Sequence, residues 1–315
     1  MSEFDLIRRY FTRTTPGALL GVGDDAALLK VAADKVLAVS SDMLVAGTHF
    51  FADTDPKCLG HKALAVNLSD LAAMGAVPRW ATLALALPGA DEAWLAQFSA
   101  GFFTLAGHYG VDLVGGDTTR GPLNLCVTIF GEVAPQKALR RSGAAVGDEI
   151  WVSGCLGDAA LALAHLQREI ELSQDEFAAC EPALLMPSPR VALGQALCGI
   201  ASSAIDISDG LLADLGHILA ASGIGAQIDF SAVPVSETLR RYPQLAQRCA
   251  LAGGDDYELC FTAPAARHRD LQQISANMAL KLSCIGNIVA GSGCVVRDAT
   301  GNCVNLQSEG YDHFR

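Results

Sequence analysis

The N-terminal part of the chain changes its hydrophobic period several times, and these changes predict alternating strands and helices. Residues 35–41 form an apolar run, typical of a buried strand, that leads directly into Asp42. A helical pattern opens at Pro56 and continues to Met74, where Gly75 provides a C-terminal stop. Further elements are expected at 80–87 (strand), 92–109 (helix, ending at Gly110), 111–114 (strand) and 123–133 (strand). The order β-α-β-α-β-β predicts an α/β sandwich with one layer of helices.

A polar and basic stretch at 135–147 separates this region from a second set of elements and is the expected linker. After it, a strand is expected at 149–153 and a glycine-framed turn at 154–157. Helices are expected at 158–167 and 211–221, and strands at 203–207, 225–230, 258–262, 282–289 and 294–297. We therefore predict fold class α/β (α+β), with two α/β domains at 1–137 and 138–315, the second being an α/β sandwich.

Composition and net charge limit the classes of molecule that we expect this chain to bind. The chain has 315 residues, of which 51% are hydrophobic, and a formal net charge of -12. This acidic balance argues against nucleic acid or an anionic membrane as partner, since both need a basic face. The ten cysteines are scattered without zinc-finger spacing. Charges interrupt the start of the chain, and no apolar run reaches the length of a membrane span. We expect a soluble, cytoplasmic protein.

Six short acidic patches, each containing or bordered by glycine or serine, occur along both expected domains. They are Gly23–Asp25, Ser40–Asp42, Asn67–Asp70, Gly115–Thr118, Asp206–Gly210 and Gly253–Asp256. Carboxylates on tight turns are hard oxygen ligands, which Mg²⁺ takes together with substrate phosphates and water. Two unit charges about 4 Å apart repel by roughly 4 kcal/mol at an effective dielectric near 20. If the patches converge, they indicate a metal-dependent site that handles phosphoryl groups.

Each patch also has a purely structural interpretation. Asp25 fits an ordinary Gly-Asp turn, and Asp42 fits a turn or a helix cap after a strand. Asp70 is more informative, because it falls in the middle of a helix on the apolar stripe of Ala63 and Val66. A buried acid needs a partner, and metal ligation is one answer.

The patch at 206–210 follows a strand end and precedes a helix, so it has two interpretations. Ser208 or Asp209 can be the N-cap of that helix, or the helix N-terminus can receive a phosphate. At Gly115–Thr118, an acid and a hydroxyl lie beside backbone that a phosphate can approach closely. The sequence has no P-loop, no dinucleotide-binding glycine motif and no protein-kinase motif. If ATP binds, aspartates, metal ions and backbone amides must hold its phosphates.

Taken together, the patches resemble the thiamine-monophosphate kinase family, within the aminoimidazole-ribonucleotide-synthetase-like ATP-binding superfamily. The motifs that carry the resemblance cover nearly the whole chain in order. They are Gly21–Leu28, Asp42 with Gly47–Phe50, Ala65–Gly75, Gly115–Thr119, Arg141–Gly143, Asp206–Leu211, Gly253–Leu259 and Gly310–Phe314. The resemblance implies that ATP and thiamine monophosphate give ADP and thiamine diphosphate. It also implies two α/β domains, with the N-terminal sheets pairing across a homodimer.

The resemblance assigns roles residue by residue. The implied Mg²⁺ ligands, for several ions, are Asp25, Ser40, Ser41, Asp42, Asp70, Asp117, Asp206 and Asp209. The implied ATP contacts are Tyr109, Gly116, Asp117, Arg141 and Ser208, and the implied thiamine contacts are His49, Asp255 and Tyr311. The family more often has Glu at the position of Asp255 and Trp at that of Tyr311. Both changes keep the chemical type but alter the reach of the side chain. His49 can alternatively be a loop histidine with a structural hydrogen bond.

The mechanism consistent with these residues is direct in-line transfer of the γ-phosphoryl group. A phosphate acceptor is already anionic near neutral pH, so no general base is expected. Catalysis then consists of positioning and charge neutralisation, supplied by Mg²⁺ with Asp42, Asp70 and Asp117 and by the guanidinium of Arg141. One alternative is another ATP-using enzyme of the superfamily that acts on an amidine, a selenium compound or a carbamoyl group. A second is a non-catalytic regulator that binds nucleotide or Mg²⁺.

Overall fold

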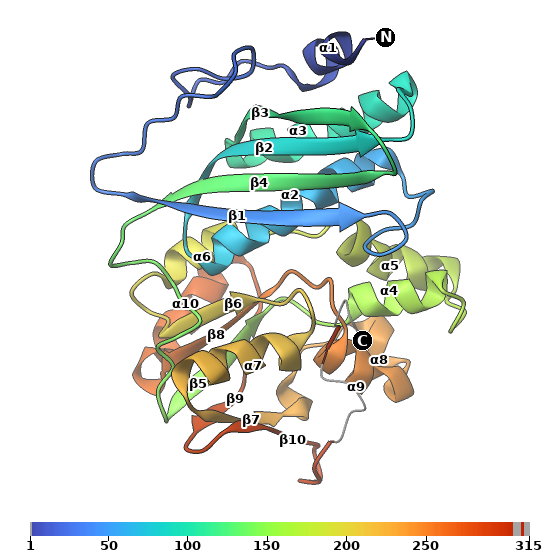
Figure 1. Ribbon diagram of the computed structural model, residues 1–315. Helices are drawn as coiled ribbons and strands as arrows, with labels where there is room; N and C mark the ends of the chain where they lie inside the picture. Colours follow the sequence, from blue (N-terminus) through green and yellow to red (C-terminus); the bar gives the residue numbers. More distant parts are fainter. Residues whose placement is uncertain (1, 305–309, 312–315) are drawn as a thin grey trace. The chain divides into compact units, whose positions relative to one another are not determined.

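A computed structural model describes residues 2–304, 310 and 311, and the chain divides into two units (Figure 1). The first unit contains Met1–Leu71 and Ala76–Gln136, and the second contains Ala72–Gly75 and Lys137–Arg315. Each unit has its own sheet and its own helices. The predicted fold class, two α/β domains, is therefore confirmed.

The first unit is built on a four-stranded sheet in the order β1-β4-β2-β3. The strands are β1 (Val36–Val45), β2 (Val77–Leu87), β3 (Asp112–Arg120) and β4 (Asn124–Val133). Neighbouring strands are antiparallel except β2 and β3, which run parallel. In this order β1 and β3 are the two end strands, so residues on them lie at opposite edges of the sheet.

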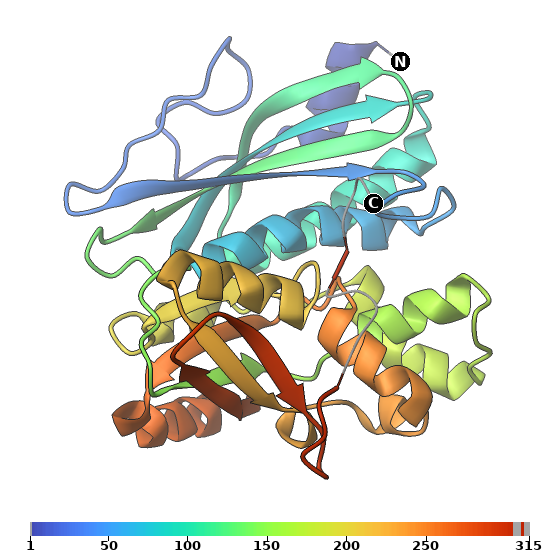
Figure 2. The ribbon, with the colours of Figure 1, turned by 60° about the horizontal axis from the view of Figure 1, so that its bottom comes forward.

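Two long helices, α2 (Pro56–Ala73) and α3 (Glu92–Tyr109), cover one face of this sheet (Figures 1 and 2). Gly110 ends α3 in the left-handed conformation that the sequence pattern predicts. The two helices touch backbone to backbone. A Cβ atom on Gly60 of α2 would lie 2.0 Å from the carbonyl oxygen of Phe98 on α3. A Cβ atom on Gly101 of α3 would lie 1.9 Å from that of Lys57. Only glycine permits this close packing.

The chain before β1 contains a short helix α1 (Glu3–Leu6) and a π-helical turn η1 (Ile7–Phe11), neither of which the sequence pattern predicted. Tyr10 and Phe11 are buried, and the Phe11 ring packs edge-on against Phe98 of α3 at a centroid distance of 6.4 Å. These aromatic contacts attach the N-terminal segment to the helical layer of the first unit.

Three strands of the first unit, β1, β2 and β3, are longer than predicted, and the extensions of β1 and β3 contain acidic residues of the patches. Asp42 lies inside β1 and not after it, paired with Val127 of β4. Residues 115–118 lie inside β3, where Gly116 pairs with Leu83 of β2. The predicted end of the strand at 114 is wrong because β2 supplies a continuous hydrogen-bonding partner, which local glycine content cannot reveal.

The second unit contains a six-stranded sheet in the order β10-β7-β9-β5-β8-β6. All neighbours are antiparallel except β10 and β7. The strands are β5 (Asp148–Ser153), β6 (Ser203–Asp206), β7 (Gly225–Asp229), β8 (Leu259–Pro264), β9 (Leu282–Val289) and β10 (Gly293–Arg297). All six were predicted, with boundaries that differ by no more than two residues.

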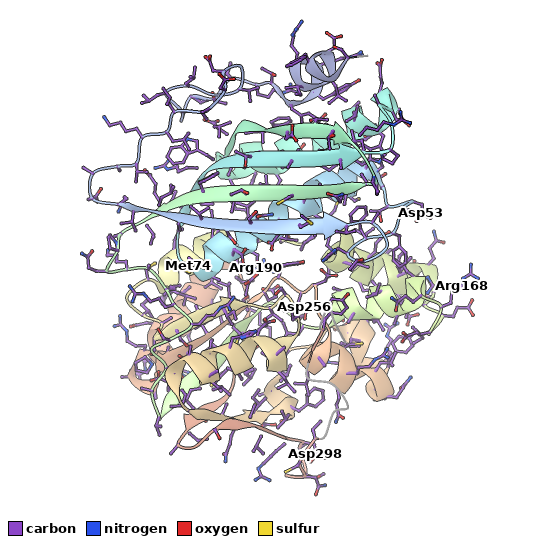
Figure 3. The ribbon with its side chains drawn as sticks, in the orientation of Figure 1. Asp53, Met74, Arg168, Arg190, Asp256 and Asp298 are labelled. Carbon is purple, nitrogen blue, oxygen red and sulfur yellow. The ribbon has the colours of Figure 1, made fainter. Side chains whose placement is uncertain are left out.

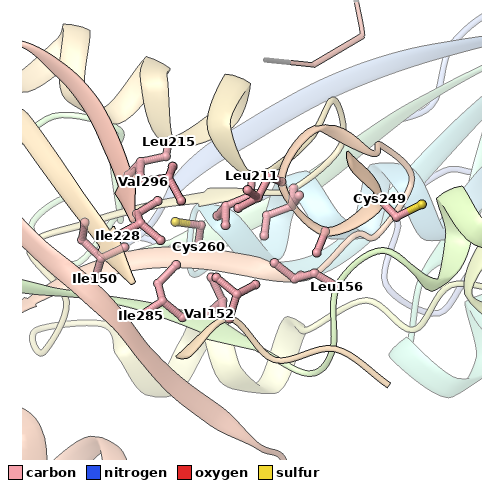
Figure 4. Close-up of a cluster of buried hydrophobic side chains, with 14 of the residues drawn as sticks. Ile150, Val152, Leu156, Leu211, Leu215, Ile228, Cys249, Cys260, Ile285 and Val296 are labelled. Atoms are coloured by element: carbon pink, nitrogen blue, oxygen red, sulfur yellow. The ribbon is translucent and has the colours of Figure 1, made fainter. Parts of the chain in front are cut away.

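Helix α7 (Leu211–Ser222) packs against β6, β8 and β10 and helps to cover the buried core of Figure 4. Leu211 and Leu215 from this helix meet Ile150, Ile228 and other apolar side chains of the sheet. The helices at α4 (Asp158–Leu166) and α7 were predicted. The pattern missed α5 (Gln174–Leu185), α6 (Val191–Leu197), α8 (Glu237–Arg240), α9 (Pro243–Ala252) and α10 (His268–Met278), and the short turns η2 (Phe230–Ala232) and η3 (Ala265–Arg267).

No helix in the described part of the chain is long and apolar enough to cross a bilayer. All ten cysteines carry free thiols.

Candidate active site

In the first unit, β1 and α2 bring three polar side chains together. Ser40 and Asp42 are two positions apart on β1 and share its partly buried face, because side chains alternate along a strand. The Ser40 hydroxyl donates a hydrogen bond to the carboxylate of Asp70 on α2. Asp70 is half-buried and not fully buried, and Ser40 on β1 is one partner of its carboxylate.

Asn67 is a site residue that the sequence analysis did not single out. Its side-chain oxygen accepts a hydrogen bond from the backbone N–H of Asp42 at 3.2 Å, and its amide nitrogen donates to the Ala63 carbonyl at 3.0 Å. Asn67 is completely buried. Because it lies one turn before Asp70, it fixes α2 against the part of β1 that carries Asp42. An amide side chain in the middle of a helix, one turn after Ala63 of the apolar stripe, is the sequence signal that could have indicated this role.

Ser41 points away from this group. Its hydroxyl lies 2.9 Å from the Thr128 hydroxyl on β4, on the opposite face of the sheet from Ser40. His49, in the turn after β1, accepts a hydrogen bond from the backbone N–H of Val45 through Nδ1 at 3.1 Å. This bond matches the structural interpretation of His49 and leaves Nε2 as the protonated nitrogen. Asp25 lies in the exposed loop before β1.

Asp117 is not brought next to Asp42 within one chain. Asp42, Val127, Leu83 and Gly116 form one row across the sheet, from β1 at one end to β3 at the other. Three strand spacings separate the ends of that row by about 14 Å. Asp117 is the next residue on β3 and is exposed. Its neighbours across the sheet are Ala84, Cys126 and Met43, on the face opposite to Asp42.

In the second unit, two loops and Tyr311 bring five of the predicted site residues together. Asp206 is the last residue of β6, the loop after it carries Ser208 and Asp209, and the loop before β8 carries Asp255. The backbone N–H of Asp255 donates to the Ser208 carbonyl at 2.9 Å, and that of Tyr311 donates to the Asp209 carbonyl at 3.0 Å. Residues predicted to contact metal, ATP and thiamine are therefore adjacent here. The other tail residues of the motif, 312–314, lie outside the described residues.

The loop before β8 holds two non-glycine residues in the left-handed conformation, Asp255 (φ 67°) and Tyr257 (φ 49°). Each costs about 1–3 kcal/mol, and such residues concentrate at functional sites. The Tyr257 hydroxyl donates to the Asp255 carboxylate at 2.9 Å, which fixes the direction of that side chain. The loops also need Gly254, because a Cβ atom there would lie 2.5 Å from the Ser208 carbonyl oxygen.

The start of α7 differs from the N-cap interpretation of the sequence. The N-cap is Gly210, and it makes no side-chain capping bond, so neither Ser208 nor Asp209 is the cap. The backbone N–H groups of residues 208, 209 and 210 all donate to the carboxylate of Asp214, at 3.0, 3.0 and 3.1 Å. An internal carboxylate thus occupies the N–H groups of residues 208–210. Burial, helped by the charge of Asp209, raises the pKa of Asp214 to about 7, against the lowering effect of these N–H bonds.

A second carboxylate, Asp256, is buried in the loop before β8 (Figure 3). Its two oxygens accept from the Gly157 N–H at the start of α4, at 2.9 and 3.0 Å. Burial raises the pKa of Asp256 well above its usual range, opposed by the Gly157 bond and reinforced by the nearby charges of Glu258, Asp158 and Asp255. Asp256 therefore connects the strained loop to the N-terminus of α4.

Glu258 completes the support of this loop. Its carboxylate accepts from Arg190 Nε at 2.7 Å, from a second Arg190 nitrogen and from the Ser153 hydroxyl. Glu258 is buried, whereas the Arg190 side chain is a quarter exposed. A two-pronged Arg–carboxylate pair of this kind fixes both partners in one orientation. The pattern of the sequence gave no sign of it, because Arg190 lies 68 positions away.

Arg141 lies between β6 and the C-terminal end of α7. The carbonyl of its neighbour Arg140 accepts from the backbone N–H of Ala204 on β6 at 2.9 Å, and the Arg141 carbonyl accepts from the Ser222 hydroxyl. The Arg141 side chain is exposed. Tyr109 is the last residue of α3, and its ring lies 4.7 Å from that of His108.

The candidate ligands are carboxylate and hydroxyl oxygens, which are hard donors suited to Mg²⁺. Among the residues that the structure describes, no group of three or more His, Cys, Asp or Glu side chains is arranged to hold a metal ion. Mg²⁺ usually takes only one or two carboxylates and completes its shell with water and substrate phosphates. Paired oxygens such as those of Ser40 and Asp70 fit that mode of binding.

Comparisons with known proteins place both units of the chain in one family. Residues 23–133 match the family described as AIR synthase related protein, N-terminal domain, and residues 145–299 match its C-terminal domain. Thiamine-monophosphate kinase of Escherichia coli (strain K12) is 50% identical over 99% of this chain and 98% of its own.

Two solved structures extend the similarity to the whole fold. Thiamine-monophosphate kinase from Stenotrophomonas maltophilia K279a has a TM-score of 0.88 and 48% identity, over 96% of this chain and 98% of its own. AaThiL complexed with AMPPCP and TMP has a TM-score of 0.80 and 30% identity, over 99% and 96%. The chain is thus similar in sequence and fold, along nearly its full length, to enzymes of one kind, and it belongs to the thiamine-monophosphate kinase family.

Proposed function

We propose that this chain transfers the γ-phosphoryl group of ATP to thiamine monophosphate and releases ADP and thiamine diphosphate. The observation that carries the proposal is the 50% identity with the Escherichia coli thiamine-monophosphate kinase over 99% of the chain. ATP is the co-substrate, in keeping with the AMPPCP bound by the relative AaThiL. We also propose the expected division of labour, in which residues 1–137 bind ATP and Mg²⁺ and residues 138–315 complete the nucleotide and substrate contacts.

The reaction needs positioning and charge neutralisation more than proton transfer. The attacking oxygen belongs to a phosphate, so it is anionic near neutral pH and needs no base. Bound Mg²⁺ would neutralise charge on the phosphates. The acids and hydroxyls that the resemblance assigns to Mg²⁺ would hold it. Ser40 orients the Asp70 carboxylate by its hydrogen bond, and Asn67 holds α2 against the backbone of Asp42. Both interactions fix ligand positions before the reactants arrive, which lowers the cost of ordering them.

The thiamine end of the substrate would meet Asp255 and Tyr311. The Tyr311 side chain is 53% exposed, so its ring is accessible to a ligand. An aromatic face attracts the cationic thiazolium by about 0.5–2 kcal/mol. The hydrogen bond from Tyr257 and the left-handed backbone hold Asp255 in one direction, as a specificity contact requires.

We also propose a homodimer, and the two end strands of the first sheet support it. On β1, Val36, Leu37, Val39 and Met43 are exposed, and long apolar edge strands are usually covered in the native assembly. A two-fold axis that pairs β1 of one copy with β3 of the other covers both edges at once. In that arrangement a second copy can bring its Asp117 to the β1 edge that carries Asp42, which one chain alone does not do. Cytoplasmic location stays a prediction.

The test is an assay of purified protein with ATP, Mg²⁺ and thiamine monophosphate, in which ADP and thiamine diphosphate are both quantified. We expect the two products in equal amounts, and no ADP formation when an amidine, a selenium compound or a carbamoyl compound replaces thiamine monophosphate. Asp42→Asn should lower turnover by about 100-fold at unchanged folding, because it removes charge stabilisation at nearly constant shape. Asp34→Asn, in the exposed turn before β1, is the matched control. Normal turnover of Asp42→Asn contradicts the assignment.

A further inference from the structure

Asp214 lies in the first turn of α7 and is buried, with 3% of its surface exposed. One of its oxygens, Oδ2, accepts all three hydrogen bonds from the backbone N–H groups of Ser208, Asp209 and Gly210. Two of these donors belong to residues that precede the N-cap Gly210. The bonds therefore order the loop before the helix, and not only the helix itself.

The carbonyl groups of the same loop are used as well. Ser208 accepts from the backbone of Asp255, and Asp209 accepts from the backbone of Tyr311. Asp214 thus accepts hydrogen bonds from the N–H groups of the loop. The two segments that carry the predicted thiamine contacts donate hydrogen bonds to its carbonyl groups. With the backbone fixed in this way, the Cα–Cβ directions of Ser208 and Asp209 are set.

We propose that Asp214 is a positioning residue, which fixes the 208–210 loop so that Ser208 and Asp209 are in place for nucleotide and Mg²⁺. This inference rests on the proposed function, since it assumes that the loop receives Mg²⁺ and ATP. Asp214 itself contacts neither. Because its carboxylate occupies the three N–H groups, the nucleotide phosphates are held by side chains and metal ions at this loop and not by its backbone amides.

The alternative is that Asp214 only stabilises the second unit. A comparison with a second buried aspartate, Asp148, distinguishes this structural role from the positioning role. Asp148 is also buried, and its carboxylate accepts from the backbone N–H of Ala145 at 3.0 Å, in a turn at the start of β5. No predicted site residue belongs to that turn. Asp148→Asn and Asp214→Asn both weaken a buried carboxylate–amide interaction, so both should lower the free energy of unfolding.

The decisive measurement is the affinity for Mg²⁺ with a non-hydrolysable ATP analogue, obtained by calorimetry without turnover. Loss of an outer partner of a metal site typically weakens binding by about 10–100-fold. We therefore expect Asp214→Asn to raise the Kd at least about 10-fold, and Asp148→Asn to change it less than about twofold. An Asp214→Asn protein that is folded and binds the analogue like wild type overturns the inference.

A second measurement needs no variant, in case Asp214→Asn does not fold. Amide hydrogen exchange of the peptide that spans residues 206–212 is followed in the nucleotide-free wild type. We expect strong protection before nucleotide is added, with little change afterwards. Fast exchange that becomes slow only when the analogue and Mg²⁺ bind would show that the phosphates take these amides, and would overturn the inference. Failure of the wild type to form thiamine diphosphate, with these results intact, counts against the proposed function alone.

Discussion

The separation of Asp42 and Asp117 on the first sheet predicts that a working site draws on two chains. The two positions occupy opposite end strands, about 14 Å apart. Ligands of one Mg²⁺ lie about 2.1 Å from it, and two metal ions in a shared site are about 4 Å apart. Carboxylates that share such a site are therefore separated by no more than about 8 Å. One chain alone cannot bring Asp42 and Asp117 to the same ions.

The perturbation is a mixed dimer of Asp42→Asn and Asp117→Asn chains, co-expressed with two different tags and purified through both. If each site takes Asp42 from one chain and Asp117 from the other, one of the two sites keeps both carboxylates. The mixed dimer should then show about half of wild-type turnover, whereas each variant alone should fall by about 100-fold. If both carboxylates come from one chain, neither site is intact and turnover stays near 1% of wild type, within the same order of magnitude.

The reciprocal dimer provides the control. One wild-type chain is paired with a chain that carries both substitutions, and thiamine diphosphate formation is measured in the same assay. With shared sites, each site lacks one carboxylate and the turnover is lost. With separate sites, the wild-type chain works alone and about half of the turnover remains. Half activity in the reciprocal dimer together with loss in the mixed dimer would refute the reasoning.

Three further results are expected from the second unit. Arg190→Ala removes one partner of a buried ion pair and should lower the free energy of unfolding by about 3 kcal/mol, as measured by urea titration. Arg248→Ala breaks an exposed pair and should cost less than about 1 kcal/mol, so equal losses would contradict this. Asp256 has a raised pKa in the folded state, so its contribution is present below the unfolded pKa and is lost as the pH rises. Unfolding measured from pH 5 to pH 8 should therefore show a flatter decline for Asp256→Asn than for wild type, and parallel curves would exclude a protonated Asp256.

The local sequence pattern was sufficient to predict those elements whose hydrophobic periodicity lies entirely within one continuous segment. Helix α2 with its stop at Gly75 and helix α3 with its stop at Gly110 follow from periodicity and cap chemistry. Asp70 was also predictable in part, because its place on the apolar stripe of α2 required a polar partner. The identity of that partner, Ser40, depends on how β1 packs against α2, which only the folded chain defines.

The features that were missed depend on contacts between distant segments. The extension of β3 through two glycines exists because β2 supplies hydrogen-bonding partners along its length. The order of the strands, and with it the separation of Asp42 from Asp117, is a property of long-range pairing. Asp214 resembled an ordinary acid in the first turn of a helix, and its three bonds to the preceding loop have no local signature. The metal and substrate roles of the individual residues stay predictions.

The glycine contact between α2 and α3 has a consequence for how variants of this enzyme will behave. A side chain at Gly60 would force the two helices apart, and α2 is the element that presents Asn67 and Asp70 to β1. A substitution at this remote position should therefore impair turnover even in molecules that remain folded. Kinetic screening would score such a change as an active-site lesion, although its origin is the spacing of two helices behind the sheet.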